Sequence, residues 1–465
     1  MDRTDRGWMR RARVVALGAV GVAAAVIAGS AAMRGGAQPG ASLRAEASSG
    51  ASYSIAVRAR NEGDVDAVAA YAASLGYAVS GRIDGLPALR VTPPAGVGVA
   101  QAITAFRSKP GVLYAEPSYR LQSADLPADP LYAREATYLQ AVHAPEAWNI
   151  EQGKSSVIVA VLDTGIDLNH PDLQGRIWAN AGETPNNGID DDANGCIDDV
   201  NGCAFVANPS PGCSGSLNGN VNDELGHGTF VSGIIAANGN GVGMVGIARN
   251  VTIMPVKVLD CSGEGDSLAL TQGILYAARA GARVENISLG GPIRSALTQE
   301  AVRIAHDLYS VVIVAATGNT GKSGVNYPAA YPQVVAVGAA SSADPGKRAV
   351  FSSSGPEVDV VAVGQDIVGT VPQSSCARFL PCINGGPYAA GDGTSFSAPQ
   401  VSALVALMLS HYSSMKPDQV LSILKATADP LPAGDRPDWA GSGRVNMLQA
   451  LKPAYRLGAP GLTKN

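Results

Sequence analysis

The chain has 465 residues, of which 46% are hydrophobic and 16% are charged. This composition is typical of proteins with buried cores and excludes a disordered chain. The length predicts two folded units with extensions. The net charge of −5 does not indicate a nucleic-acid-binding protein, so no nucleic acid partner is expected.

The N-terminal 38 residues have the pattern of an export signal. Arg10, Arg11 and Arg13 lie directly before an apolar run over residues 14–33, which ends in small residues. Residues 1–38 are therefore interpreted as a signal peptide, and residues 39–51 as a Gly/Ala/Ser-rich linker. The protein is expected to be secreted and extracellular. Because the run is long enough to span a bilayer, a membrane anchor formed by residues 14–33 is the alternative.

Residues 52–122 predict a small α+β unit. Strands are expected at 53–57, 88–91 and 112–115, where apolar residues alternate or cluster in short runs. Helices are expected at 65–75 and 99–106, where apolar residues recur at helical spacing. The unit contains no catalytic constellation.

The pattern changes to alternating strands and helices after about residue 130. Short apolar runs predict buried strands, and the stretches between them have helical periodicity. This alternation indicates an α/β unit with a parallel sheet and helices on both of its faces. The strands are expected at 157–162, 251–258, 311–316 and 334–339, and the helices at 227–237, 267–280 and 295–308.

Three residues form a candidate catalytic set at the ends of these elements. Asp163 follows a buried strand, and His227 lies at a glycine-flanked helix start. Ser395 follows a glycine-rich turn and precedes the helical run 401–409, so it is expected at a helix N-terminus. A nucleophile activated by a base, which a carboxylate orients, requires these three residue types. Each of them alone could equally be a capping or structural residue.

Asn319 follows the strand at 311–316 and sits beside Gly318. A side-chain amide at this point can donate to the oxyanion of a tetrahedral intermediate. Without the other three motifs, this Gly-Asn pair would be interpreted as an ordinary turn.

Together the four motifs resemble the subtilisin-like serine proteases (peptidase S8, subtilases). Their order, Asp163, His227, Asn319 and Ser395, is the order in this family. The resemblance covers residues 130–453, which would form a subtilisin-like catalytic domain followed by a tail at 454–465. It implies that Asp163, His227 and Ser395 are the triad and that Asn319 binds the oxyanion.

The resemblance also implies two segments that bind the substrate backbone as added strands. One is Gly263-Glu264-Gly265 and the other is Ser288-Leu289-Gly290, with Thr317 and Gly318 beside the expected specificity pocket. Several residues depart from the family pattern, among them Phe230 where a second histidine is common, and Glu285 in an apolar strand. Thr317 and Glu264 leave the substrate preference open.

The unit at 52–122 resembles the inhibitory propeptide (inhibitor I9-like) of these enzymes. We expect it to assist folding, to inhibit the enzyme as an intramolecular partner, and to be removed by self-cleavage between about Tyr119 and Pro130. A permanent accessory domain is the alternative.

An acidic loop suggests a cation site. Asp190, Asp192 and Asn194, followed by Gly195, match the opening of a calcium-binding loop. Since many relatives carry calcium here, the resemblance implies a structural Ca²⁺ held by Asp190, Asp192, Asn194 and Asp199. A solvated acidic loop is the alternative.

Six cysteines accompany the export signal and favour disulfide bonds. Cys376 and Cys382 bracket one loop and are the expected pair. The other four cysteines leave their connectivity open.

The sequence therefore predicts a secreted, monomeric serine endopeptidase that is made as a zymogen and acts on protein or peptide substrates. A serine esterase of the α/β-hydrolase type is disfavoured by the order of the triad. Two alternatives stay open: a catalytically silent peptide-binding protein on the same scaffold, and a membrane-tethered processing protease.

Overall fold

The computed structural model describes residues 54–452 except 108, 119–125, 377, 435 and 437. The expected signal peptide, linker and C-terminal tail, and most of the expected maturation region, lie outside the described residues. Within the part of the chain that is described, no helix is both long and apolar enough to cross a bilayer.

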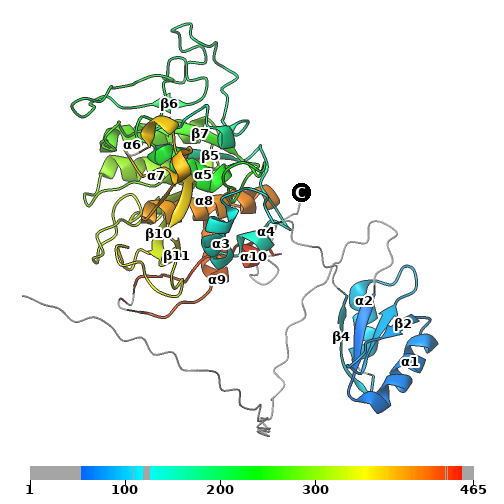
Figure 1. The fold of residues 1–465 in the computed structure, drawn as a ribbon. Helices are drawn as coiled ribbons and strands as arrows, with labels where there is room; N and C mark the ends of the chain where they lie inside the picture. The colour runs from blue at the N-terminus through cyan, green and yellow to red at the C-terminus, as the bar shows by residue number, and fades with distance from the viewer. Residues whose placement is uncertain are drawn as a thin grey trace, which may run out of the picture.

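The N-terminal unit is a four-stranded antiparallel sheet with two helices (Figure 1). The strand order is β2-β3-β1-β4, and apolar side chains of the helices and the sheet share one core. The sequence did not predict β2, whose residues are all exposed or half-buried and so carry no apolar alternation. The elements are β1 (Ile55–Ala59), α1 (Val65–Ser74), β2 (Ala78–Arg82), β3 (Ala88–Thr92), α2 (Val99–Arg107) and β4 (Val112–Pro117).

The larger unit is built on a seven-stranded sheet of order β11-β10-β9-β8-β5-β7-β6. All neighbouring strands pair in parallel, as the alternating pattern predicted. Strand β5 lies between β7 and β8 and pairs with both. Because the pairing is parallel, strands that are distant in sequence have their carboxyl ends at the same edge of the sheet. The strands are β5 (Ile158–Asp163), β6 (Cys203–Ala204), β7 (Thr252–Lys257), β8 (Val284–Ile287), β9 (Val312–Ala316), β10 (Val334–Ala340) and β11 (Val360–Val363).

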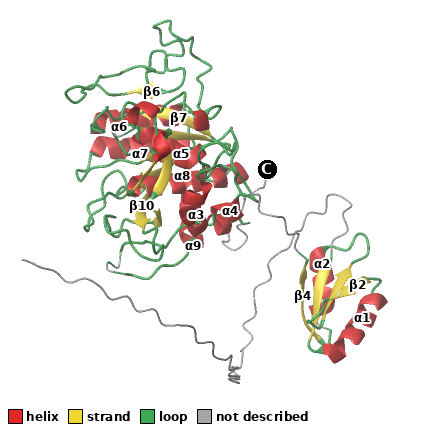
Figure 2. Ribbon diagram, viewed as in Figure 1, coloured by secondary structure: helices red, strands yellow, loops and turns green. Residues whose placement is uncertain are grey.

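Helices cover both faces of this sheet (Figure 2). Alternate residues of β5 enter different cores: Val159 and Val161 pack with α5 and α8, whereas Ala160 and Leu162 pack with α6 and α7. The strands are therefore apolar on both sides, which explains their unbroken hydrophobic runs. The helices are α3 (Tyr132–Ala141), α4 (Ala144–Ala147), α5 (His227–Ala236), α6 (Ser267–Arg279), α7 (Ala296–Tyr309), α8 (Thr394–His411), α9 (Pro417–Thr427) and α10 (Met447–Leu451).

A two-stranded antiparallel hairpin leads into the longest helix. β12 (Ile367–Thr370) pairs with β13 (Tyr388–Gly391), and α8 begins three residues later at Thr394. Ser395 therefore lies in the first turn of α8, as predicted. The helix continues through Pro399, which is fully buried and lies beyond the first turn.

Candidate active site

The candidate catalytic residues converge at the carboxyl ends of the strands. Asp163 is the last residue of β5, His227 is the first residue of α5, and Asn319 follows β9. His227, Asn319 and Ser395 line one cavity of about 280 Å³. The parallel sheet brings these distant residues together because its strands all end at the same edge.

Asp163 and His227 form a close pair. Nδ1 of His227 lies 2.7 Å from Oδ1 of Asp163, whose side chain is fully buried. The same carboxylate oxygen accepts a hydrogen bond from the backbone N–H of Thr164 at 2.7 Å. This geometry fixes the carboxylate, and the other imidazole nitrogen, which has no hydrogen-bond partner among the described residues, can act toward the cavity.

The pKa of His227 lies above the ordinary value for histidine. Burial of the ring lowers the pKa, but the charge of Asp163 and its hydrogen bond together raise it by more. Only a neutral imidazole can accept a proton, and His227 loses this form as the pH falls through its raised pKa.

We expect Asp163→Asn to move the acid limb of the kcat/KM profile to lower pH. The substitution removes the negative charge that raises the pKa of His227. It should also lower kcat at the plateau by about 10⁴-fold, as in other serine protease triads. The measurement is kcat/KM of wild type and variant between pH 4 and 10 (about the range that brackets histidine titration). An unmoved limb would show that another group controls it.

The start of α5 approaches β5 closely because of two glycines and one buried acid. A Cβ on Gly228 would lie 2.1 Å from the carbonyl oxygen of Gly165, so no side chain fits there. Gly226 has φ of 116°, which a side chain disfavours. Asp223 accepts hydrogen bonds from the N–H groups of Gly226 and Thr229 at 2.7 and 2.9 Å. Sequence reasoning missed Asp223, which fixes the helix that carries His227.

Asn319 is held by its side-chain amide oxygen. Its Oδ1 accepts hydrogen bonds from the backbone N–H and the hydroxyl of Thr394, both at 2.9 Å. Because the oxygen is occupied in this way, the Nδ2 donors remain available for a ligand near Ser395. The exposed position of Asn319 at the cavity wall suits a donor to a developing oxyanion.

The proline in α8 has a direct effect on the serine. Pro399 has no N–H, so it cannot donate to the carbonyl of Ser395, which is four residues earlier. That carbonyl instead accepts a hydrogen bond of 2.8 Å from the hydroxyl of Ser288. The segment after β8 is thereby attached to the turn that carries Ser395.

The cavity contains most of the expected substrate-binding residues. Among the described residues, Glu264, Gly265 and Thr317 do not line it. Thr317 is fully buried, and its neighbours on either side line the cavity in its place. The lining includes Gly263, Ser288, Leu289, Gly290, Ala316 and Gly318, together with Leu225, Leu259 and Asn326, which sequence reasoning missed.

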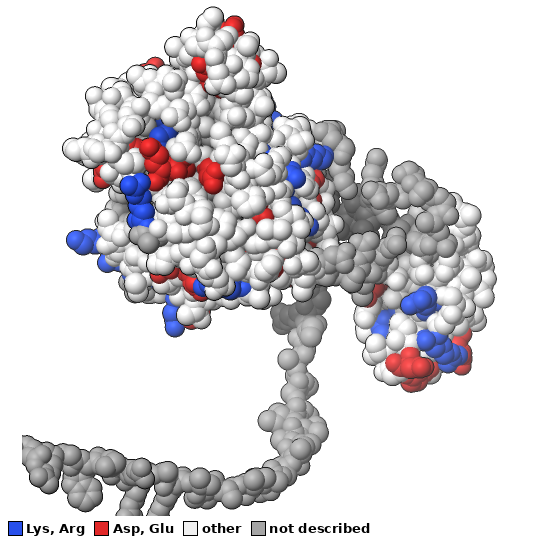
Figure 3. Space-filling model, turned by 45° about the horizontal axis from the view of Figure 1, so that its top comes forward, with Lys and Arg blue, Asp and Glu red and all other residues white. Residues whose placement is uncertain are grey.

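Charged side chains cover little of the surface in Figure 3, where small acidic and basic groups lie interspersed. The cavity itself has no lysine, arginine, aspartate or glutamate among its described lining residues. Recognition of a ligand there therefore depends on backbone groups, on amides and on shape.

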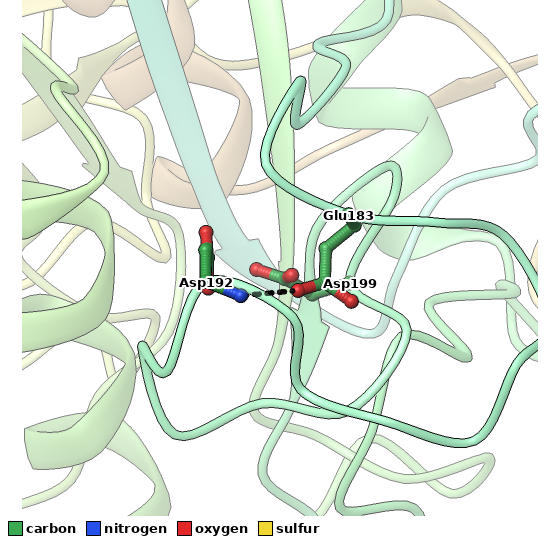
Figure 4. Close-up of side chains that lie close together, drawn as sticks. All are labelled: Glu183, Asp192 and Asp199. Carbon is green, nitrogen blue, oxygen red and sulfur yellow. Dashed lines mark hydrogen bonds between the residues drawn. The ribbon is translucent and has the colours of Figure 1, made fainter.

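An acidic cluster lies in the long loop between β5 and β6. Glu183, Asp192 and Asp199 each place one carboxylate oxygen within 4.8 Å of the others (Figure 4). Glu183 Oε1 accepts the N–H of Asp192 at 3.2 Å, whereas its buried Oε2 has no hydrogen-bond partner among the described residues. Burial and the charges of Asp199 and Asp192 raise the pKa of Glu183. Three converging carboxylates with an unpaired oxygen fit a hard cation such as Ca²⁺.

The expected calcium ligands divide into two groups. Asp192 and Asp199 belong to the cluster, and Asn194 donates hydrogen bonds from Nδ2 to both of them, at 3.1 and 2.9 Å. The oxygens of Asp190 instead accept the N–H groups of Asn194 and Gly195, which shapes the turn. Glu183 lies outside the D-x-D-x-N-G pattern, so the motif gave no signal for it.

A second set of buried carboxylates lies near α3. Asp129 and Asp172 are both buried, and one oxygen of Asp172 has no hydrogen-bond partner among the described residues. Burial, with a smaller contribution from Asp129, raises the pKa of Asp172 to about 6. The sequence offered no motif for these residues.

The six cysteines form three disulfide bonds. The expected Cys376–Cys382 pair is confirmed. The pairs that were left open are Cys196–Cys203 and Cys213–Cys261.

Comparison with known proteins agrees with this geometry. The model of the subtilase family matches residues 154–450. Thermitase of Thermoactinomyces vulgaris is 36% identical over 327 residues, which is 70% of this chain and 99% of thermitase. Subtilisin E of Bacillus subtilis (strain 168) is 33% identical over 357 residues, 76% of this chain and 78% of the relative. A solved protease structure from Pseudoalteromonas arctica has a TM-score of 0.57 and 28% identity, covering 70% of this chain and 99% of its own.

The chain belongs to the subtilase family. Its α/β fold and its similarity to the subtilisins and to thermitase make it a subtilisin-like serine endopeptidase.

Proposed function

We propose that the protein hydrolyses peptide bonds by acyl transfer to Ser395. The observation that supports this most directly is the 2.7 Å pair of His227 and Asp163 beside the cavity that Ser395 and Asn319 line. Labelling by a fluorophosphonate, with and without Ser395, is the test.

Each group has one role in the reaction. His227 accepts the hydroxyl proton as the Ser395 oxygen bonds to the substrate carbonyl carbon, while Asp163 holds the imidazole. Asn319 donates to the resulting oxyanion, a contribution that is worth about 10²–10³ in kcat in subtilisin itself. His227 then gives the proton to the leaving amine and the C–N bond breaks. Water then attacks the carbonyl carbon of the acyl-enzyme while His227 accepts its proton. His227 returns the proton to the Ser395 oxygen as the ester bond breaks.

We infer that the substrate backbone binds between two segments beside the cavity, of which Gly263 and Ser288-Leu289-Gly290 line it. Gly263-Glu264-Gly265 follows β7, and Ser288-Leu289-Gly290 follows β8. Ser288-Leu289-Gly290 directly continues β8, and Gly263-Glu264-Gly265 lies beyond a turn that follows β7. An extended peptide can pair with such segments by backbone hydrogen bonds. Glu264 is exposed and can contact substrate side chains from the rim.

Asn326 is proposed to limit the side chain that precedes the scissile bond. A Cβ on Gly318 would lie 2.7 Å from Nδ2 of Asn326, and one on Gly290 would lie 3.2 Å from its Cβ. The Asn326 side chain therefore fills the space between the segment that contains Gly318 and the segment that contains Gly290. No hydrogen bond joins it to other described residues, so a large apolar group would cover unpaired polar atoms at a cost.

We expect Asn326→Gly to raise kcat/KM for peptides with Phe or Leu at this position by roughly tenfold or more, since about 1.4 kcal/mol is tenfold. Activity on peptides with Ala there should change little. The measurement is kcat/KM on a peptide series that differs only at that residue. Thr317→Ala is the matched control, because the Thr317 side chain is buried outside the cavity. An equal change for all peptides would contradict a role in selectivity.

Residues 52–122 are proposed to be a propeptide that assists folding, inhibits the enzyme and is removed by self-cleavage between about Tyr119 and Pro130. A separate core and a complete four-stranded sheet support an independent unit. The strand β4 ends at Pro117, just before the proposed cleavage region.

We propose Ca²⁺ as a structural cofactor in the loop between β5 and β6. Glu183, Asp192 and Asp199 would supply its charged ligands, with Asp190 and Asn194 shaping or completing the site. Isothermal titration of chelator-stripped protein would count the ions. Uptake of one ion that Glu183→Gln abolishes would support this site, and no uptake would contradict it.

The mature protein is proposed to be secreted and monomeric. Three disulfide bonds favour an oxidising compartment. If residues 14–33 anchored the chain instead, cell fractionation would find the uncleaved protein in membranes. A catalytically silent peptide-binding protein is the remaining alternative, and it would not react with a fluorophosphonate.

A further inference from the structure

A loop closed by a disulfide bond lies beside the catalytic pair. It connects the hairpin strands β12 and β13, and the disulfide Cys376–Cys382 closes it. Strand β13 leads directly to the turn that carries Ser395, so this loop is continuous with the nucleophile segment.

The loop contacts the segments that carry both His227 and Ser395. The Arg378 guanidinium donates a hydrogen bond of 3.2 Å to the carbonyl of Glu224, three residues before His227. Ser375 lies 3.2 Å from the position that a Cβ on Gly226 would occupy. On the other side, Leu380 lies 2.7 Å from where a Cβ on Gly391 would be. The loop therefore bridges the two segments.

One aromatic residue of the loop packs on the catalytic imidazole. The rings of Phe379 and His227 lie 5.5 Å apart between centroids at an angle of 84°. Phe379 also meets Phe230 edge to face, at 6.1 Å and 82°. Phe396, the residue after Ser395, lies 5.8 Å from His227 and 4.3 Å from Phe230. Phe379 and Phe396 thus confine the imidazole, with Phe230 packed behind them.

This packing has a consequence for the catalytic base. The imidazole must keep Nδ1 on Asp163 while its other nitrogen serves Ser395, and only one ring orientation satisfies both. Its hydrogen bond to Asp163 fixes one edge of the ring. The neighbouring aromatic rings resist rotation of the His227 side chain. One of these rings, Phe379, belongs to the disulfide-closed loop between β12 and β13.

We propose that Phe379, held in place by the Cys376–Cys382 disulfide, is a positioning residue for His227. The inference depends on the proposed triad, and it assigns to the disulfide loop a role in the efficiency of proton transfer. Phe379 does not itself touch the reacting atoms.

The test compares three variants of the full chain with wild type. Phe379→Ala should lower kcat by about tenfold to a hundredfold, the range that small misplacements of catalytic groups produce, with little change in KM. Phe379→Tyr keeps the ring and should retain most of kcat. The double variant Cys376→Ser/Cys382→Ser keeps the ring but releases the loop, and it should lose kcat in the same direction as Phe379→Ala.

Controls separate positioning from general damage. Tyr309→Ala removes an aromatic ring at the end of α7, next to the start of β9. This position is at the amino ends of the strands, away from the candidate site at their carboxyl ends, so the variant should leave kcat unchanged. Thermal unfolding midpoints show whether each variant is folded. If Phe379→Ala keeps kcat, or if it raises KM alone, the positioning role is wrong.

The proposed triad can fail independently of this proposal. A wild-type protein that a fluorophosphonate does not label overturns the proposed triad chemistry itself. If wild type is labelled and Phe379→Ala has the same kcat as wild type, only the role of the loop is overturned.

Discussion

Replacement of Ser395 by alanine is expected to lower kcat about a million-fold, the loss measured for the same change in subtilisin. Ser395 lies in the first turn of α8 and lines the cavity together with His227 and Asn319. Without its hydroxyl no acyl-enzyme can form, so labelling by a fluorophosphonate should also disappear. Hydrolysis of a peptide substrate and covalent labelling are both measured.

Ser410→Ala is the matched control for this experiment. It removes a hydroxyl from the same helix, where Ser410 bonds to the backbone at Ala406 and Lys154, far from the cavity. This variant should be labelled like wild type. A Ser395→Ala protein that still hydrolyses peptides at the wild-type rate would show that another residue is the nucleophile.

The same pair of proteins tests self-maturation. Intact mass and N-terminal sequencing of protein from an exporting host should find that wild type starts between about Tyr119 and Pro130. Ser395→Ala should keep residues 52–122. If both proteins keep that unit while wild type is labelled, another protease activates the enzyme. If wild type is neither processed nor labelled, the protein binds peptides without cleaving them.

Removal of calcium is expected to cost roughly 4 kcal/mol of folding free energy when the free ion was present at about 1,000 times its dissociation constant. Glu183, Asp192 and Asp199 would then repel one another, since none of them forms a salt bridge within the described part of the chain. For a unit of this size the unfolding midpoint should fall by roughly 6 °C. Calorimetry on the Ser395→Ala protein, with calcium or with chelator, avoids self-digestion.

Variants of the acidic loop identify the ligands. Glu183→Gln should abolish most of the difference between calcium and chelator, because it removes the charge of the unpaired buried carboxylate. Asp191→Asn is the control, because Asp191 instead accepts hydrogen bonds from Thr184 and Asn187. Asp190→Asn distinguishes a ligand from a residue that only shapes the turn. An identical midpoint with and without calcium would refute the site.

Local patterns were sufficient to predict four of the seven strands of the large sheet. Apolar runs gave β5, β7, β9 and β10 to within a residue or two, because strands buried on both faces must be apolar throughout. Strand β2 was missed for the opposite reason, since its exposed residues carry no pattern. The helix α8 passes through Pro399, and Ser288 donates a hydrogen bond to the carbonyl that the proline leaves without its helical partner.

The sequence by itself determined the family, the α/β sheet and the four candidate catalytic residues, because these depend on short motifs and on their order along the chain. Only the tertiary structure decided which loop residues join them. Glu183 in the acidic cluster, Asn326 in the cavity wall and Phe379 on the imidazole each lie outside any motif. Their positions depend on contacts between segments far apart in sequence, as do the pairs Cys196–Cys203 and Cys213–Cys261. Periodicity and spacing describe local structure, and they carry no information about where two distant loops meet.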